Sequence, residues 1–214
     1  MPAADLAPQP AAADADATGA FLARAIGWIL TFAGAAGLLA AFTLTVEKIR
    51  LLEDPTHVPA CSINAVLSCG SVMSSPQAEA FGVPNPLLGI AGFSALAALG
   101  VALVAGARLP RWLWLAIQAG VTFALGFVHW LFFQSVYRIE ALCPYCMVVW
   151  VAAIVAFVYV TLRNLAEGAL PTPRALRVPA AAAVRNHGVI VTVWLLAVGL
   201  LIGVAFWDYW RTLL

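Results

Sequence analysis

The chain has 214 residues, of which 64% are hydrophobic and only 10% are charged. A soluble domain carries about 25% charged residues, so this composition excludes an ordinary soluble enzyme and a disordered adaptor. The formal net charge of +1 provides no basic surface for phosphates, and no nucleic-acid partner is expected. The composition indicates a small membrane protein with several spans.

Five apolar runs contain none of the charged residues and hold between 19 and 26 residues each. About 20 apolar residues are needed to cross a hydrocarbon core of ~30 Å. Because lipid offers the backbone no hydrogen bonds, each run is predicted to form a helix. The predicted fold is an all-α integral membrane protein with five transmembrane helices. The runs are Gly27–Val46, Leu87–Ala107, Trp112–Tyr137, Ala141–Leu162 and Val189–Trp207.

The distribution of basic residues predicts the orientation. With the N-terminus cytoplasmic and the C-terminus extracytoplasmic, seven of the 11 basic residues lie inside. The charges that follow the first run, among them Glu47 and Lys48, are interpreted as a solvated extension of its helix. The expected segments are a disordered tail over 1–20, a four-helix bundle over 21–165 with an outside cap loop over 47–86, a cytoplasmic loop over 166–187 and a fifth transmembrane helix within 188–214.

The four cysteines form two pairs, Cys61 with Cys69 in the cap loop and Cys143 with Cys146 at the start of the fourth helix. Two membrane crossings separate the pairs, so both lie on the same face of the membrane in either orientation. If that face is extracytoplasmic, it is also a compartment in which disulfides persist.

The second pair has the sequence Cys-Pro-Tyr-Cys. Pro144 suits the first position of a helix, which makes Cys143 the N-cap residue. Its sulfur then lies near the positive end of the helix dipole, where the pKa of a thiol falls and the reactive thiolate is favoured. Cys146 lies about one turn deeper, where a membrane-dissolved molecule can reach it.

Several interpretations of these cysteines compete. They could be inert buried residues, a four-cysteine zinc site, structural disulfides, or a redox relay in which one pair reduces the other. The CxxC at a helix start favours the relay. The alternative class is a membrane metal-binding or small transport protein, which would use the cysteines as soft ligands or line a path with polar residues. Only Gln118, His129 and Gln134 are available for such a path.

The stretch CSINAVLSCGSVMSSPQAEAFGVPNPLLG, followed by CPYC at 143–146, resembles the vitamin K epoxide reductase family. The similarity spans roughly 25–165, and a fifth helix is typical of the bacterial branch. The shared elements are Cys-x7-Cys, Ser74-Ser75, Phe81-Gly82, Asn85 with Gly89, and the CxxC that opens the fourth helix.

The resemblance implies a quinone-linked thiol oxidoreductase that drives disulfide formation in exported proteins. Electrons would pass from Cys61 and Cys69 to Cys143 and Cys146, through a transient bridge from Cys69 to Cys143, and then to a quinone, menaquinone or ubiquinone. No metal is implied. By the same resemblance, the residues that contact the quinone are Asn85, Trp150, Met73 and Ser75.

Two of these positions differ from the animal enzymes. Trp150 replaces a tyrosine that helps to hold vitamin K, and Met73 replaces an aromatic residue. These differences favour plain quinone reduction over epoxide reduction. The expected electron donor is a separate thioredoxin-fold (DsbA-like) thiol oxidase. The expected location is the bacterial cytoplasmic (inner) membrane, with the active site facing the extracytoplasmic side.

Overall fold

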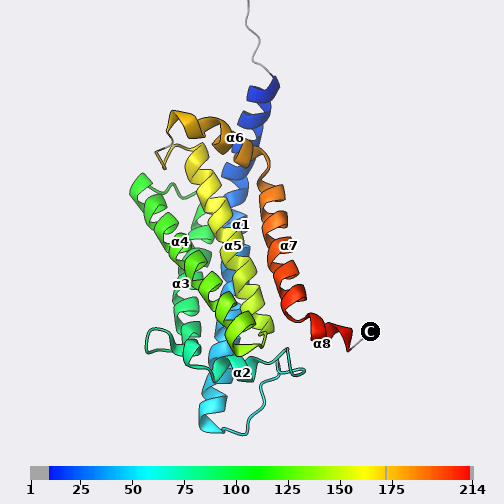
Figure 1. The fold of residues 1–214 in the computed structure, drawn as a ribbon. Helices are drawn as coiled ribbons and strands as arrows, with labels where there is room; N and C mark the ends of the chain where they lie inside the picture. Colours follow the sequence, from blue (N-terminus) through cyan, green and yellow to red (C-terminus); the bar gives the residue numbers. More distant parts are fainter. Residues whose placement is uncertain (1–9, 172, 213–214) are drawn as a thin grey trace, which may run out of the picture.

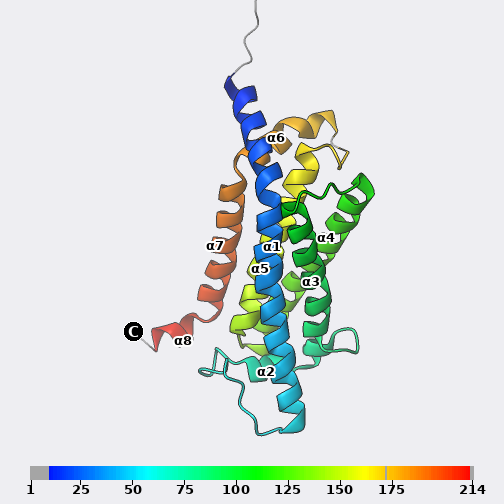
Figure 2. The same ribbon diagram turned by 180° about the vertical axis from the view of Figure 1, so that it is seen from behind.

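The structure is a computed structural model that describes residues 10–171 and 173–212. Within these ranges, five helices are long and apolar enough to cross a membrane, which confirms the predicted fold class. The helices run roughly along one common axis (Figures 1 and 2). They are α1 (Pro10–Glu53), α3 (Asn85–Val104), α4 (Arg111–Gln134), α5 (Pro144–Ala166) and α7 (His187–Ala205).

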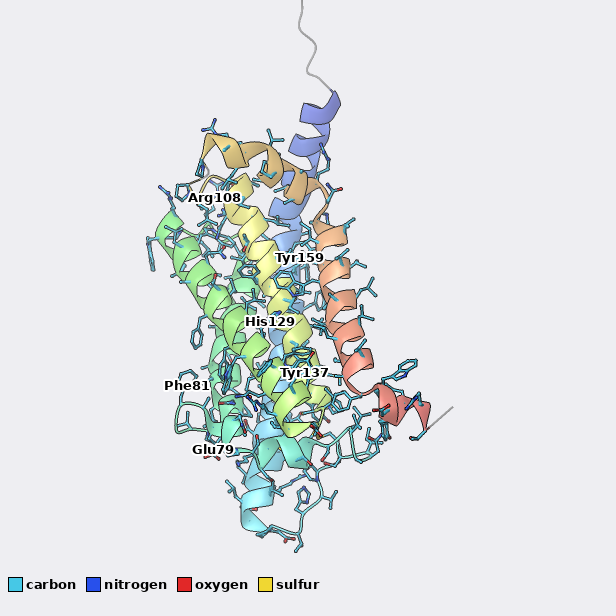
Figure 3. The ribbon with its side chains drawn as sticks, in the orientation of Figure 1. Glu79, Phe81, Arg108, His129, Tyr137 and Tyr159 are labelled. Atoms are coloured by element: carbon cyan, nitrogen blue, oxygen red, sulfur yellow. A yellow bond between two sulfur atoms is a disulfide. The ribbon has the colours of Figure 1, made fainter. Side chains whose placement is uncertain are left out.

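Shorter helical elements lie at the two ends of this bundle. Between α1 and α3, the chain forms α2 (Cys69–Met73) and the 3₁₀ turn η1 (Pro76–Glu79). Figure 3 shows Glu79 and Phe81 at this end, which we call the cap end, and Arg108 at the opposite end. The remaining elements are the π-helical turn η2 (Ser135–Ile139), η3 (Arg174–Leu176), α6 (Arg177–Arg185) and α8 (Trp207–Arg211).

The core of the bundle forms around α1, which packs against α3 and α5, while α4 packs against α5. The contact between α1 and α3 is close because small residues line it. A Cβ atom added to Gly34 would come within 2.7 Å of the Cα atom of Ala97, so only glycine permits this approach. Small residues are the usual means by which membrane helices approach each other, since no hydrophobic effect drives their association in lipid.

The fifth helix, α7, has no buried residue, but its apolar side chains pack against α5, and polar contacts join it to the bundle as well. The indole N–H of Trp194 donates to Nε2 of His129 over 3.1 Å. Nδ1 of His129 therefore carries the proton and donates to the Leu125 carbonyl over 2.9 Å. A second contact joins the Tyr159 hydroxyl and Nδ1 of His187 over 3.0 Å. His129 is thus a packing residue rather than part of a polar path across the membrane.

Two predicted segments differ from the structure. The disordered tail was predicted over 1–20, but α1 already begins at Pro10. Pro10 suits a first helical position, and the alanines that follow favour a helix; residues 1–9 of the predicted tail lie outside the described residues. The predicted loop over 166–187 contains η3 and α6. Pro179 falls in the first turn of α6, where its missing N–H breaks no helical hydrogen bond.

Candidate active site

Two backbone hydrogen bonds join the cap loop to the segment that precedes α5. The Leu142 N–H donates to the Val66 carbonyl over 2.7 Å, and the Ser68 N–H donates to the Leu142 carbonyl over 2.9 Å. Together they form a one-residue parallel bridge between Leu67 and Leu142. Since α2 begins directly after Ser68 and α5 directly after Cys143, the bridge places the two cysteine pairs side by side.

The sulfur atoms of the two pairs are close enough for exchange. Cys61 and Cys69 form a disulfide with their Cα atoms 5.6 Å apart, while Cys143 and Cys146 are free thiols. The sulfurs of Cys69 and Cys143 are 3.2 Å apart, although 74 positions separate them in the chain. Both residues have no exposed area, and Cys61 has 6%. Within the described ranges, no three His, Cys, Asp or Glu side chains gather into a group that could hold a metal ion.

Cys143 is the N-cap of α5 and Pro144 is its first residue, as predicted. The Cys143 sulfur accepts a hydrogen bond from the backbone N–H of Cys146 over 3.4 Å. The pKa of Cys143 is lowered, first by a hydrogen bond from the Cys146 thiol and further by the backbone N–H groups of Cys146 and Tyr145, and this effect exceeds the opposing effect of burial. The site therefore stabilises a thiolate on Cys143.

An irregular turn delivers the chain into Cys143. The helix α4 ends in the π-helical turn η2, and the next residue, Glu140, adopts a left-handed conformation with φ 55°. The Ser135 hydroxyl, which is buried, donates to the Ala141 carbonyl and closes this turn. A left-handed non-glycine residue costs on the order of 1 kcal/mol or more, and such residues concentrate at functional sites.

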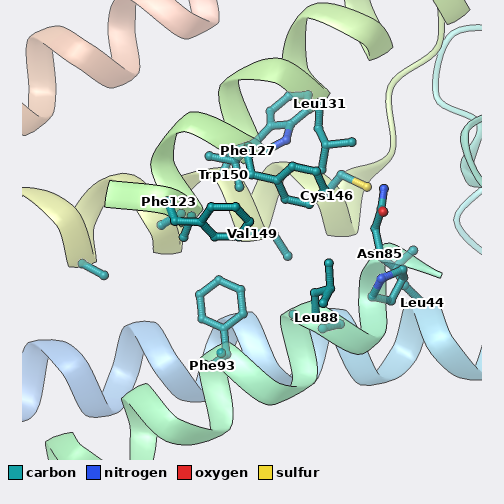
Figure 4. A pocket seen from close by; sticks show the side chains of 18 of the residues that line it. Leu44, Asn85, Leu88, Phe93, Phe123, Phe127, Leu131, Cys146, Val149 and Trp150 are labelled. Atoms are coloured by element: carbon teal, nitrogen blue, oxygen red, sulfur yellow. The ribbon is translucent and has the colours of Figure 1, made fainter. Parts of the chain in front are cut away.

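An apolar cavity of about 540 Å³ lies next to the sulfurs, between α1, α3, α4 and α5, and extends from the cap end toward the opposite end of the bundle. Cys146 lines this cavity and points into it from the first turn of α5 (Figure 4). Leu88 and Phe93 of α3 lie on one side in this view, and Phe127 and Leu131 of α4 on the other. The size and the apolar lining are typical of a small-molecule site.

All four residues that the resemblance assigned to quinone contact line this cavity. The Asn85 side chain donates to the Gln77 carbonyl over 2.7 Å and accepts from the Ala80 N–H over 3.1 Å, so it also holds the cap loop. Trp150 packs edge-on against Phe132 with ring centroids 5.1 Å apart. The other two, Met73 and Ser75, line the cavity at the cap end. We call this part of the cavity wall, formed by α2, η1 and the residues between them, the roof.

The sequence interpretation missed two charged residues that fasten this roof. Lys48 donates to the Met73 carbonyl over 2.9 Å and pairs with Glu79 over 3.0 Å. Glu47, which is buried, pairs with His57 of the cap loop over 2.8 Å. The helix does extend over these residues as interpreted, since α1 ends at Glu53, but the expectation that Glu47 and Lys48 are solvated was wrong. A signal was present, because they continue the buried stripe of α1 one turn after Leu44.

The contact between the sulfurs predicts a trapped disulfide. In a Cys61→Ala/Cys146→Ala variant, Cys69 and Cys143 have no resolving thiols and should form a bridge under mild oxidation. The bridge would be measured as a reductant-sensitive mobility shift and as one crosslinked peptide pair. The matched control is Cys69→Ala/Cys146→Ala, which leaves Cys61 to reach Cys143 and should bridge less readily. Equal bridging in both variants would contradict the geometry.

The hydrogen bond from Cys146 predicts how Cys143 titrates. Cys146→Ala removes the principal cause of the lowered pKa and leaves burial, so the pKa of Cys143 should rise and the thiolate should form only at higher pH. The ultraviolet absorbance of the thiolate would be followed against pH, with Cys143→Ala/Cys146→Ala as the blank. An unchanged midpoint in Cys146→Ala would show that the Cys146 thiol does not stabilise the anion.

The contacts of Lys48 predict its contribution to stability. Lys48→Met removes a charged hydrogen bond and an ion pair from the roof and should lower the free energy of unfolding by about 1–2 kcal/mol. Arg211→Met, which breaks an exposed ion pair with Asp208, is the control and should change it by less than about 0.5 kcal/mol. Thermal unfolding in detergent would measure both. Equal effects would mean that Lys48 does not fasten the roof.

A comparison with known protein families agrees with the geometry of this site. The Vitamin K epoxide reductase family matches residues 28–161, more than half of the 214 residues. The match contains both cysteine pairs, the cap loop and most of the four helices that enclose the cavity. The chain therefore belongs to the vitamin K epoxide reductase family.

Proposed function

We propose that this membrane protein reoxidises a thioredoxin-fold partner and so drives disulfide formation in exported proteins. Its family membership supports the general activity of a quinone-linked thiol oxidoreductase. The observation that carries the proposal is the 3.2 Å contact between the sulfurs of Cys69 and Cys143, with Cys146 facing the apolar cavity. One side of the site thus meets the cap loop, and the other side meets the membrane-embedded cavity.

The electrons enter at the cap loop. A dithiol partner attacks Cys61, because that residue keeps 6% of its area exposed while Cys69 has none. The Cys61–Cys69 bond breaks, a mixed disulfide forms at Cys61, and Cys69 leaves as a thiolate. The second thiol of the partner then displaces Cys61, so the partner departs as a disulfide and the loop pair holds the two electrons.

Two exchanges then carry the electrons to the second pair. The Cys69 thiolate attacks the Cys143–Cys146 disulfide at Cys143, a Cys69–Cys143 bridge forms, and Cys146 leaves as a thiolate. Cys61 then attacks Cys69, which restores the loop disulfide and releases Cys143 as a thiolate. A disulfide between Cys61 and Cys69 with free thiols at Cys143 and Cys146 is the arrangement found in the structure.

The cavity is the proposed site of the quinone. Two electrons from the reduced CxxC and two protons convert the quinone to a quinol, and the Cys143–Cys146 disulfide forms again. Asn85, Trp150, Met73 and Ser75 are proposed to surround the ring, since each lines the cavity with Cys146. Menaquinone and ubiquinone both satisfy this chemistry.

The proposed location is the bacterial cytoplasmic membrane, with the cap end on the extracytoplasmic side. The positively charged connection between α5 and α7 supports a cytoplasmic position for the opposite end. In this orientation, the N-terminus is cytoplasmic and the disulfide between Cys61 and Cys69 lies in an oxidising compartment. A DsbA-like thiol oxidase is the kind of partner that this compartment provides.

The test is quinone reduction by the purified protein with a reduced thioredoxin-fold donor, followed as loss of quinone absorbance. Cys61→Ala and Cys69→Ala should lower the rate with this donor to the uncatalysed rate. Both should keep activity with a membrane-soluble dithiol, which reaches Cys146 through the cavity. Cys143→Ala and Cys146→Ala should abolish both activities. If all four variants fail equally with the small dithiol, the two pairs do not form a relay.

A further inference from the structure

The apolar cavity contains side-chain amides from two different walls. Asn85 lies at the start of α3 and Gln134 at the end of α4, and both line the cavity with Cys146. In Figure 4, Asn85 lies on the α3 side of the cavity, across from the residues of α4. A side-chain amide offers two N–H donors and one carbonyl acceptor, and those that no residue uses are open to a ligand in the cavity.

Asn85 has one N–H left after its contacts with the cap loop. Its Nδ2 donates one hydrogen to the Gln77 carbonyl, and its Oδ1 accepts from the Ala80 N–H. A side-chain amide carries two N–H donors, so one donor of Asn85 is not used by these bonds. That donor is available to a ligand in the cavity.

Gln134 has its whole amide left. No hydrogen bond joins this amide to another residue in the described part of the chain, and the side chain is neither fully buried nor fully exposed. Its backbone is nevertheless held firmly. The next residue, Ser135, starts the π-helical turn, and its buried hydroxyl donates to the Ala141 carbonyl. The turn that delivers Cys143 to the active site therefore also sets the position of Gln134.

We propose that Gln134 is the second hydrogen-bonding anchor of a para-quinone ring, with Asn85 as the first; this inference rests on the proposed function. A para-quinone has two carbonyl oxygens on opposite sides of its ring, and the two amides come from facing helices. An amide can donate to a quinone carbonyl and can also accept from a quinol hydroxyl. Gln134 can therefore hold both the substrate and the product.

A third amide provides the matched control. Gln77 also lines the cavity, but it lies on the same side as Asn85. The Asn85 side chain donates to the backbone carbonyl of Gln77, a bond that does not involve the Gln77 side chain. A ring held by Asn85 therefore places its distant carbonyl toward Gln134 and away from Gln77. Gln134→Met and Gln77→Met each replace an amide with an unbranched apolar side chain of similar length, so the two variants differ chiefly in the wall that they change.

The test measures binding without turnover. The protein is oxidised at both cysteine pairs, which prevents reduction, and is titrated in detergent with para-naphthoquinone and with its mono-ketone analogue, tetralone. Quenching of tryptophan fluorescence reports the dissociation constant. Gln134→Met should weaken naphthoquinone binding about tenfold, the effect of one lost hydrogen bond, and should leave tetralone binding nearly unchanged. Gln77→Met should change neither constant by more than about twofold.

Infrared spectra of bound, carbonyl-labelled naphthoquinone provide a readout that a structural defect does not imitate. In the wild-type protein, both carbonyl bands should lie at the lower frequency of hydrogen-bonded groups. In Gln134→Met, one band should return to the frequency of a free carbonyl. Two shifted bands in the variant, or a free carbonyl band already present in the wild type, would overturn the assignment of Gln134.

The outcomes separate this inference from the proposed function. If the wild-type protein neither binds naphthoquinone nor reduces it with a thiol donor, the proposed function fails, and the inference fails with it. If the wild type does both and Gln134→Met keeps the wild-type dissociation constant, only the role of Gln134 is wrong. A stronger effect in Gln77→Met than in Gln134→Met would move the second anchor to the roof and would also overturn the inference.

Discussion

The candidate active site depends on the short backbone bridge between the cap loop and the segment before α5. Its two hydrogen bonds involve Val66, Ser68 and Leu142, and each cysteine that meets at the centre of the site directly follows a bridging segment. Backbone hydrogen bonds shielded by a packed core are costly to break, because their groups would remain unsatisfied. The bridge therefore holds two sulfurs in contact that lie 74 positions apart.

A second constraint on the candidate site is that α1 and α3 lie close together, whereas α3 and α4 leave space for the cavity between them. Gly34 and Ala97 let α1 and α3 approach closely, whereas α3 and α4 contribute facing walls to the cavity of about 540 Å³. The roof closes this space with residues of α2 and η1, and Lys48 holds both elements from α1. The loop disulfide and the apolar cavity thus lie on different sides of the Cys143–Cys146 pair: Cys69 contacts Cys143, and Cys146 lines the cavity.

The charged groups at the cap end show how a membrane protein keeps buried charges. The carboxylate of Glu47 pairs with His57 and Arg50, and the ammonium of Lys48 faces a carbonyl and the carboxylate of Glu79. A buried charge without such partners would cost several kcal/mol. These pairs connect α1 to loop segments on both sides of α2, so the cap is fastened at several points in addition to the backbone bridge.

The sequence by itself determined the spans, the fold class, and the shared face of the cysteine pairs. It did so because these features follow from the length and polarity of continuous segments. The N-cap position of Cys143 was also predictable, since Pro144 fits only a few helical positions. Each of these features depends on a short continuous segment and not on contacts between distant segments. Lipid strengthens the prediction of the spans, because it offers the backbone no hydrogen-bond partner and so requires each long apolar run to form a helix.

Only the tertiary structure decided which groups meet. The π-helical turn after Gln134, the left-handed Glu140 and the contacts of Lys48 depend on the packing of segments that are distant in the chain. The sequence placed Lys48 in solvent because a charge next to an apolar run usually lies there. The folded loop instead supplies Lys48 with two partners, the carbonyl of Met73 and the carboxylate of Glu79. The residues next to a side chain in the sequence indicate whether it prefers water or lipid. Which groups it contacts depends on how the whole chain folds.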